Sequence, residues 1–281
     1  MFKQLTLVCF VLLAAVSVQA QMETPQPSPA AMKKQTVGLT EVTLEYSRPA
    51  MRGREIFGDL VPYDQVWRTG ANANTKFTVS DDIMVNGKEL KAGTYALYTK
   101  PGKKSWDVIF YSDASNWGTP RQWDESKVAL TTNVPTRKMG MEEESFDINI
   151  ATLNNDGAHL VIEWASTQVR VPFTVPTSQK AMKSIEAAMA GPTANDMYSA
   201  ATYYHDAGLD LKQAHKWITQ ATEGRPEAFW YHRRKSLIEA DLGMKNQAIS
   251  SARKSLDLAQ KAGNMDYVKM NKDSLKEWGA M

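Results

Sequence analysis

The chain has 281 residues, of which 43% are apolar, and its 33 lysines and arginines nearly balance 31 aspartates and glutamates to leave a net charge of +2. This apolar content can fill a sizeable core, which excludes a chain that is disordered throughout. The near-neutral charge argues against a dedicated nucleic-acid binder, because such a protein needs a basic face to neutralise phosphates. No apolar run reaches the length of about 18 residues that a membrane span requires, so we expect no membrane span.

Residues 1–20 have the pattern of a cleavable signal peptide. Lys3 precedes a short apolar run, and the segment ends in the small residue Ala20, as signal peptidase prefers. We therefore expect an exported protein, located in the periplasm or outside the cell. The one cysteine of the chain, Cys9, lies within this segment. The mature chain would then contain no disulfide and no cysteine-ligated metal.

The next two segments differ in composition and in apolar pattern. Residues 21–32 carry prolines at alternate positions (Pro25, Pro27 and Pro29), which predicts an extended linker. From residue 33 to residue 176 apolar and polar residues alternate, as they do in half-buried strands. Turn signals separate these segments at Asn86-Gly87, Pro101-Gly102 and Asn155-Asp156-Gly157.

Because no helix-length pattern intervenes between most of these strands, we predict an all-β antiparallel sandwich or flattened barrel over residues 33–176. Pro172 lacks a backbone donor, so we expect the last strand to lie at an edge of the sheet.

After residue 176 the apolar period becomes helical. The first helix has an apolar face that includes Ala181 and Ile185, and Ser178 is its expected N-cap. Further helices are predicted over residues 196–207, 211–223, 227–242, 245–262 and 266–278. Six helices with short breaks predict an all-α helical-hairpin repeat domain over residues 177–281, so the chain as a whole has two domains.

A repeat period lies within this helical half. Ala214 and Ala248 are 34 residues apart, which is the period of the tetratricopeptide repeat. The first unit carries the expected aromatic and small residues at Tyr198, Ala201, Thr202, Ala214, Ile218, Ala221 and Pro226. The second unit is degenerate, because polar residues stand where ring or apolar side chains are expected, at His232, Lys235 and Glu239.

The segment therefore resembles tetratricopeptide repeats, and the alternative is a generic helical bundle. Stacked repeats of this kind hold peptides in a concave groove or pack on neighbouring domains. A protein or peptide partner in the helical groove is thus one expectation.

The densest unusual run in the β half spans residues 47–75. A loop of this length between strands is uncommon in a compact domain unless it has a function. Guanidinium groups pair with carboxylates, sulfates or phosphates, and an aromatic ring can stack on a sugar. These properties make a candidate binding site for a glycan or an anion, formed by Arg48, Arg52, Arg54, Trp67, Arg68 and Asn72.

A structural interpretation competes with the binding site, and the residue types favour it. Trp67 would anchor the loop in the core while the arginines pair with the nearby acids Glu55, Asp59 and Asp64. If Arg68 is such a buried clamp, Arg68→Ala leaves its carboxylate partner buried without a counter-charge and lowers the melting temperature.

Known catalytic constellations are missing from the sequence. The four histidines have no His-Glu-x-x-His spacing, and neither a Gly-x-Ser-x-Gly elbow nor a phosphate-binding loop occurs. His159 and Glu163 fit a solvent-facing row of a strand, and residues 142–144, three adjacent glutamates, fit a solvated turn. We therefore assign no catalytic residue, no metal ligand and no cofactor.

Several ordered motifs carry a resemblance to a known family. They include Tyr46-Ser47-Arg48-Pro49, Val66-Trp67-Arg68-Thr69-Gly70-Ala71-Asn72 and Ala92-Gly93-Thr94-Tyr95. Residues 28–175 resemble the secreted bacterial family catalogued as domain of unknown function 2911. The resemblance implies the same domain boundaries and export, and it supplies no catalytic residues.

Three hypotheses follow for the function. The first is an exported, non-enzymatic binding or assembly protein with a helical annex for protein interaction. The second is a glycan- or anion-binding module that uses residues 48–72, with Trp67, Trp117 or Trp123 as a stacking platform. The third is a hydrolase whose residues come together from distant loops, which would place Arg68 in a cleft with carboxylates and a histidine.

Export gives the first testable prediction. If residues 1–20 are removed on export, N-terminal sequencing of native protein should begin at Gln21. An intact mass that still includes Met1 would contradict export by this route.

Overall fold

The computed structural model describes residues 24–281, so the predicted signal peptide and Cys9 lie outside the described residues. The chain divides into two compact units. The first, the β unit, contains the chain up to Thr36 together with Glu41–Leu153 and Gly157–Thr174. The second, the helical unit, contains Val175–Met281 and two hairpin turns, Val37–Thr40 and Asn154–Asp156. Among the helices described, none combines the length and apolar character that a membrane crossing needs.

The described part of the β unit forms one antiparallel sheet of nine strands, which confirms the predicted all-β fold. The sheet order is β1-β2-β3-β6-β7-β8-β9-β4-β5. The strands are β1 (Ala30–Val37), β2 (Thr40–Ser47), β3 (Thr75–Val79), β4 (Ile83–Val85), β5 (Lys88–Leu90), β6 (Gly93–Pro101), β7 (Ser105–Tyr111), β8 (Val128–Asn154) and β9 (Gly157–Thr174).

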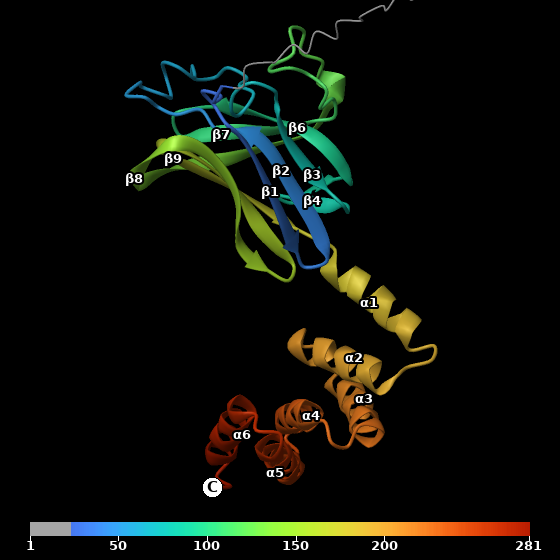
Figure 1. Cartoon of the computed structure of the whole chain (residues 1–281). Coiled ribbons are helices and arrows are strands. Elements are labelled where there is room, and N and C mark those ends of the chain that lie inside the picture. The colour runs from blue at the N-terminus through green and yellow to red at the C-terminus, as the bar shows by residue number, and fades with distance from the viewer. Residues whose placement is uncertain (1–23) are drawn as a thin grey trace, which may run out of the picture. The chain divides into compact units, whose positions relative to one another are not determined.

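The alternating residues point to one core. In β2 the side chains of Val42, Leu44 and Tyr46 are buried, and in β9 those of Leu160, Ile162 and Trp164 are buried. This period of two is what a strand with one core-facing side requires. The strands wrap around this core, and the long loop between β2 and β3, drawn in light blue, lies at one end of them (Figure 1).

Two expectations about the strands were wrong. β1 begins at Ala30, so the last three residues of the predicted linker belong to the sheet. β9 does not lie at an edge, because it stands between β8 and β4. Pro172 is tolerated there because its carbonyl accepts from the backbone N of Asn86 at 2.8 Å, where β4 gives way to the turn Asn86-Gly87. The backbone N–H that Pro172 lacks thus falls where the pairing between β9 and β4 ends.

Six helices follow in the helical unit, as the apolar period predicts. They are α1 (Thr177–Ala188), α2 (Ala194–Asp206), α3 (Leu211–Gly224), α4 (Phe229–Asp241), α5 (Lys245–Lys261) and α6 (Met265–Glu277). The expected N-cap Ser178 lies inside α1, whose N-cap is Pro176 without a side-chain hydrogen bond. Thr193 and Asp196 form a capping box at the start of α2, which satisfies two orphan backbone donors.

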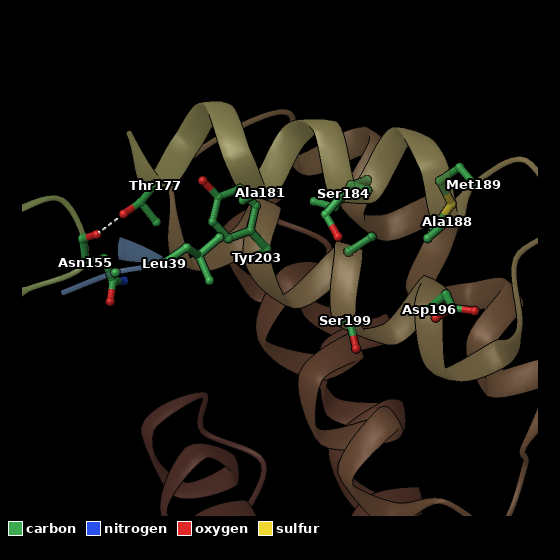
Figure 2. Close-up of a pocket in the computed structure, with 13 residues that line it drawn as sticks. Leu39, Asn155, Thr177, Ala181, Ser184, Ala188, Met189, Asp196, Ser199 and Tyr203 are labelled. Atoms are coloured by element: carbon green, nitrogen blue, oxygen red, sulfur yellow. Dashed lines mark hydrogen bonds between the residues drawn. The ribbon is translucent and has the colours of Figure 1, made fainter. Parts of the chain in front are cut away.

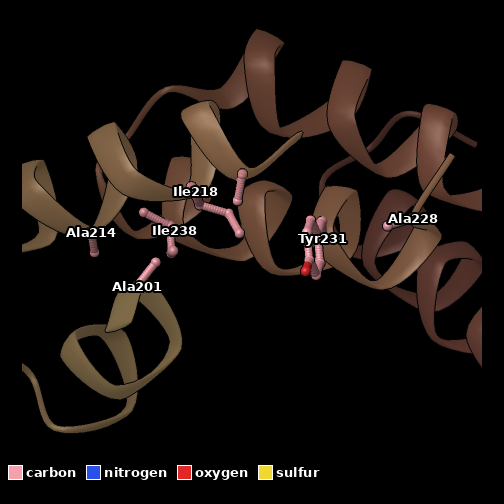
Figure 3. Packing of buried hydrophobic residues seen from close by; sticks show 7 residues of the cluster. Ala201, Ala214, Ile218, Ala228, Tyr231 and Ile238 are labelled. Carbon is pink, nitrogen blue, oxygen red and sulfur yellow. The ribbon is translucent and has the colours of Figure 1, made fainter. Parts of the chain in front are cut away.

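Small residues let the helices approach closely. The buried cluster between α2, α3 and α4 consists of Ala201, Ala214, Ile218, Ala221, Ala228, Tyr231 and Ile238 (Figure 3). Four of these seven side chains are alanines, and the Tyr198 ring stacks on Tyr231 at 4.5 Å between centroids. Of the residues that carry the repeat resemblance, Ala201, Ala214, Ile218 and Ala221 are therefore core residues, and Tyr198 packs against them.

A polar network replaces apolar packing in the degenerate second unit. Glu239 of α4 is only 2% exposed, and its carboxylate accepts from the Ser251 hydroxyl at 2.6 Å. Nε2 of His215 lies 3.4 Å away and Nζ of Lys235 lies 3.9 Å away. A buried carboxylate is tolerated when partners surround it in this way. The network links α3, α4 and α5.

The boundary at residue 176 remains a prediction, and truncation tests it. A chain that ends at Thr177 should retain a β-rich circular dichroism spectrum, because every strand of the described sheet ends by Thr174. Aggregation or loss of that spectrum would show that the sheet needs the helices for stability.

A further prediction concerns the pH dependence of the stability of the folded protein. Burial lowers the pKa of His232 below its usual 6.5, and the hydrogen bond to the Pro226 carbonyl opposes this only in part. The unfolded chain therefore binds a proton before the folded chain does. The contribution of His232 to stability is complete above pH 6.5 and declines as the pH falls below it. His232→Gln should flatten the pH dependence of chemical denaturation between about pH 7 and pH 5, and an unchanged slope would contradict this assignment.

Candidate functional site

The loop between β2 and β3 is fixed by backbone hydrogen bonds to the sheet. The backbone N of Trp67 donates to the Thr99 carbonyl at 2.7 Å, and Thr99 returns the bond at 2.9 Å. The backbone N of Asp64 donates to the Pro101 carbonyl at 2.8 Å, and Ala50 forms a bridge with Ser145 of β8. The loop is therefore an ordered part of the β unit, and its side chains have defined positions.

Aromatic rings anchor the loop from within. Trp67 stacks on Trp164 of β9 with centroids 5.8 Å apart and planes 15° apart, and it meets Phe146 of β8 edge-on at 5.2 Å. Phe57 lies 4.8 Å from Trp106 and 6.3 Å from both Trp67 and Trp164. Edge-on and offset pairs of this kind stabilise beyond the area they bury. The expectation that Trp67 anchors the loop agrees with these contacts.

Arg48 is a clamp, although with other partners than expected. Its Nε donates to the Phe146 carbonyl at 2.9 Å, and its Nη2 lies 3.3 Å from Asp147 and 3.8 Å from Glu143. Asp147 also accepts from Lys33 at 2.7 Å and from the Tyr46 hydroxyl at 2.8 Å. Burial and the bond to Asp147 raise the pKa of Tyr46. One carboxylate of β8 thus ties together β1, β2 and the start of the loop.

The expected partners Glu55, Asp59 and Asp64 form no ion pair with the loop arginines within residues 24–281. Each of these acids lies on the loop itself and is exposed. The partners of Arg48 come instead from a strand about 95 residues away in the chain, which only the tertiary fold brings close.

The glutamates at 142–144 do not form the solvated turn expected for them, because they lie inside β8. Their backbone and side chains hold the loop: the Glu144 carbonyl accepts from the backbone N of Met51 at 2.8 Å and from Nε1 of Trp164 at 3.2 Å. The Glu144 carboxylate accepts from the backbone N of Arg52 at 2.9 Å.

The other three arginines line a cavity of about 440 Å³, which we call the arginine pocket. Its lining consists of Pro27, Ser28, Pro49, Ala50, Arg52, Arg54, Leu60, Val61, Trp67, Arg68, Gly70, Ala71 and Trp164. Within residues 24–281, the exposed side chains of Arg52 and Arg54 bond only to carbonyl groups: Arg52 to Pro27 at 3.1 Å, and Arg54 to Met51 at 2.8 Å and to Ala50 at 2.6 Å. Their charges are therefore free to act on a ligand.

Arg68 is the least satisfied cation of this pocket. Its side chain is half-buried, and its buried Nε has no hydrogen-bond partner in the part of the chain that the structure describes. The guanidinium packs on Gly118, where a Cβ atom would lie 3.3 Å from Nη1. The clamp interpretation of Arg68 is therefore wrong, because no carboxylate of the described residues pairs with it.

Of the predicted site residues, Arg52, Arg54, Trp67 and Arg68 line the pocket, whereas Arg48 and Asn72 do not. Asn72 donates from Nδ2 to the Ser28 carbonyl at 3.1 Å and to the Ser47 hydroxyl at 3.3 Å, which fixes Ser28 beside the loop.

Sequence reasoning missed the contributions of Pro27, Ser28 and Trp164 to the lining. The alternation of β9 indicates that Trp164 faces inward, but no local signal shows which loop meets it.

The tryptophans do not form a common stacking platform. Trp117 is 79% exposed, whereas Trp123 packs against Tyr111 with centroids 4.7 Å apart. Trp67 faces Trp164 in the core. Trp67 is the one of the three that lines the arginine pocket.

A second cavity, of about 400 Å³, lies in the helical unit (Figure 2). Ala181 and Ala188 of α1 and the C-cap residue Met189 lie on one side of it, and Ser199 and Tyr203 of α2 lie on the other. Its lining is mainly apolar and offers no cation, so it lacks the charge that distinguishes the arginine pocket. No group of three or more His, Cys, Asp or Glu side chains in residues 24–281 is arranged to hold a metal ion.

Comparisons with known proteins give one match. No curated protein and no solved structure matches the chain. A family model described as "Protein of unknown function (DUF2911)" matches residues 28–173, which covers the whole arginine pocket apart from Pro27. The match spans more than half of the chain and agrees with the family that the sequence motifs indicated. The chain therefore belongs to the DUF2911 family.

Proposed function

We propose that this protein is an exported, non-enzymatic binding protein whose β unit binds a small anionic ligand in the arginine pocket. One observation carries the proposal: Arg68 places a half-buried guanidinium in the pocket, and its buried Nε has no partner in the described chain. Buried polar groups in native proteins are nearly always hydrogen-bonded, so this unsatisfied donor marks Arg68 as a cation that the described part of the fold does not neutralise. A carboxylate, sulfate or phosphate supplies the required acceptor oxygens.

The rest of the lining supports an anion. Arg52 and Arg54 add two cations, and none of the described lining residues is acidic. The cavity volume of about 440 Å³ is within the range of small-molecule sites. Trp67 adds part of an apolar ring to the wall beside the cations, which suits a ligand that has a ring and an acidic group.

Binding is favoured over hydrolysis by the same lining. Hydrolysis needs a general base or a nucleophile with its base next to the bound group. The described residues that line the arginine pocket include neither a histidine nor a carboxylate, and the Glu144 carboxylate beside it is bonded to the backbone N of Arg52. The hydrolase hypothesis placed both beside Arg68, so the lining supports a binding protein instead. The helical unit is then its annex for a protein or peptide partner.

A matched pair of variants tests the role of Arg68. Arg68→Ala should leave the melting temperature nearly unchanged. Loss of the Arg68 side chain leaves no carboxylate unpaired, so the free energy of unfolding should change by about 0.5 kcal/mol or less. Arg48→Ala removes the same charge but breaks the bonds to Phe146 and Asp147, so it should cost about 1–3 kcal/mol and lower the melting temperature.

Titration calorimetry with inorganic phosphate, sulfate and glucuronate completes the test. At least one probe should bind the unaltered protein, and Arg68→Ala should weaken it about tenfold or more, as the loss of a charge-assisted hydrogen bond implies. If none of the probes binds, or if Arg68→Ala destabilises the protein as much as Arg48→Ala does, the proposal is wrong.

A further inference from the structure

A second cationic pocket lies at the same loop. It has a volume of about 210 Å³ and is lined by Phe57, Tyr63, Gly102, Lys103, Trp106, Thr136, Arg137, Lys138, Ser166 and Thr167. We call it the lysine pocket. Its three cations are exposed, and none forms an ion pair with any residue that the structure describes. Nζ of Lys103 lies 5.6 Å above the centroid of the Tyr63 ring, which places a positive charge directly against an aromatic face.

The two pockets share one wall, the segment from Ile56 to Tyr63. Leu60 and Val61 of this segment line the arginine pocket, whereas Phe57 and Tyr63 line the lysine pocket. The segment is a tight turn, because the backbone N of Gly58 donates to the Val61 carbonyl at 2.9 Å and the backbone N of Val61 donates to the Ile56 carbonyl at 2.8 Å. Its position is therefore fixed.

A continuous aromatic floor joins the pockets beneath this wall. Phe57 contacts Trp164 of the arginine pocket with centroids 6.3 Å apart and Trp106 of the lysine pocket with centroids 4.8 Å apart. Each pocket is thus adjacent to the same ring. The packed aromatic core therefore helps to fix the distance between the arginine pocket and the lysine pocket.

The charges of the two pockets have the same sign. The arginine pocket contributes Arg52, Arg54 and Arg68, and the lysine pocket contributes Lys103, Arg137 and Lys138. No described residue that lines either pocket is acidic. Asp64 lies beside the lysine pocket, where its Oδ1 would be 3.6 Å from a Cβ atom at Gly102, and the Glu144 carboxylate lies beside the arginine pocket, where it accepts from the backbone N of Arg52 at 2.9 Å. The six lining cations outnumber these two neighbouring carboxylates, so the surface attracts a ligand with several negative charges.

We propose that the ligand is a chain of acidic sugars, with one acidic ring in the arginine pocket and another in the lysine pocket. This inference rests on the proposed function and extends it from a single anionic group to an oligomer. One small anion cannot reach both pockets across the wall at Ile56–Tyr63, whereas linked anionic rings can occupy both and gain from the high effective concentration of the second ring.

The aromatic residues favour a sugar over an acidic peptide. Each pocket sets a partly exposed ring beside its cations, Trp67 in the first and Tyr63 in the second. A pyranose ring has an apolar face of C–H groups that packs on such a ring while its carboxylate or sulfate meets the cations. An acidic peptide would gain from an unpaired strand edge or a backbone cradle, and neither pocket lining supplies one.

Titration calorimetry with galacturonate and tetragalacturonate tests this inference on the mature chain. Tetragalacturonate should bind about tenfold more tightly than galacturonate or better, because two pockets act together. The double variant Lys103→Ala/Lys138→Ala should reduce the affinity for tetragalacturonate to the level of galacturonate and leave galacturonate binding unchanged. The double variant Lys104→Ala/Lys212→Ala has the same net charge and alters exposed lysines outside both linings, so it should keep the preference for the longer chain.

The outcomes separate the two proposals. If galacturonate binds and depends on Arg68 while tetragalacturonate binds no more tightly, the arginine pocket stands and the extended ligand is wrong. If the preference for the longer chain survives in Lys103→Ala/Lys138→Ala, the lysine pocket is not a subsite. Tighter binding of tetraglutamate than of tetragalacturonate would overturn the choice of a sugar. If neither sugar nor any of the earlier anion probes binds, the proposed function itself fails.

Discussion

The stacking of Trp67 on Trp164 is the contact on which the arginine pocket of the β unit depends. It fastens the long loop to β9, and the paired backbone bonds between Trp67 and Thr99 hold the same point against β6. A loop fixed at this point must place the residues next to Trp67 on defined sides. Arg68, the next residue, is consequently held at the rim of the aromatic floor with its Nε buried. Ordering the loop carries an entropic cost, and burial of the aromatic rings offsets it.

Electrostatics divides the loop arginines into two kinds. Arg48 follows the end of β2 and pairs with Asp147 and Glu143, and Asp147 also accepts from Lys33 and the Tyr46 hydroxyl. Removal of a member of that network leaves polar groups without partners, which is why we expect a loss of stability there. Arg52, Arg54 and Arg68 bond to carbonyl groups or to nothing within the described chain, so their charges are not cancelled. Arginines of the same loop thus either pair with the sheet or keep a charge that the proposed ligand would meet, according to the residues that the sheet brings near them.

The helical unit packs through small side chains. Its helices bury little volume per side chain, because alanines dominate the cluster between α2, α3 and α4. Close approach of the helices replaces large side chains as the source of packing. Where the repeat pattern breaks down, Glu239 occupies a core position with Ser251, His215 and Lys235 around it. This explains how a residue that the repeat pattern does not expect is accommodated without a void.

Periodicity alone separated the β half of the chain from the helical half, because a period of two and a helical period each reflect one local geometry and one buried side. The motifs likewise indicated the family, and the density of arginines pointed to the loop. The sequence could not decide which arginine is neutralised. It suggested the nearby acids Glu55, Asp59 and Asp64, whereas the partners of Arg48 are Glu143 and Asp147 on β8. Nor could it show that Ser28, Arg68 and Trp164 line one cavity. Pairing across the sheet joins residues that are far apart in the chain, and this long-range register, with the charges it leaves unpaired, exists only in the folded protein.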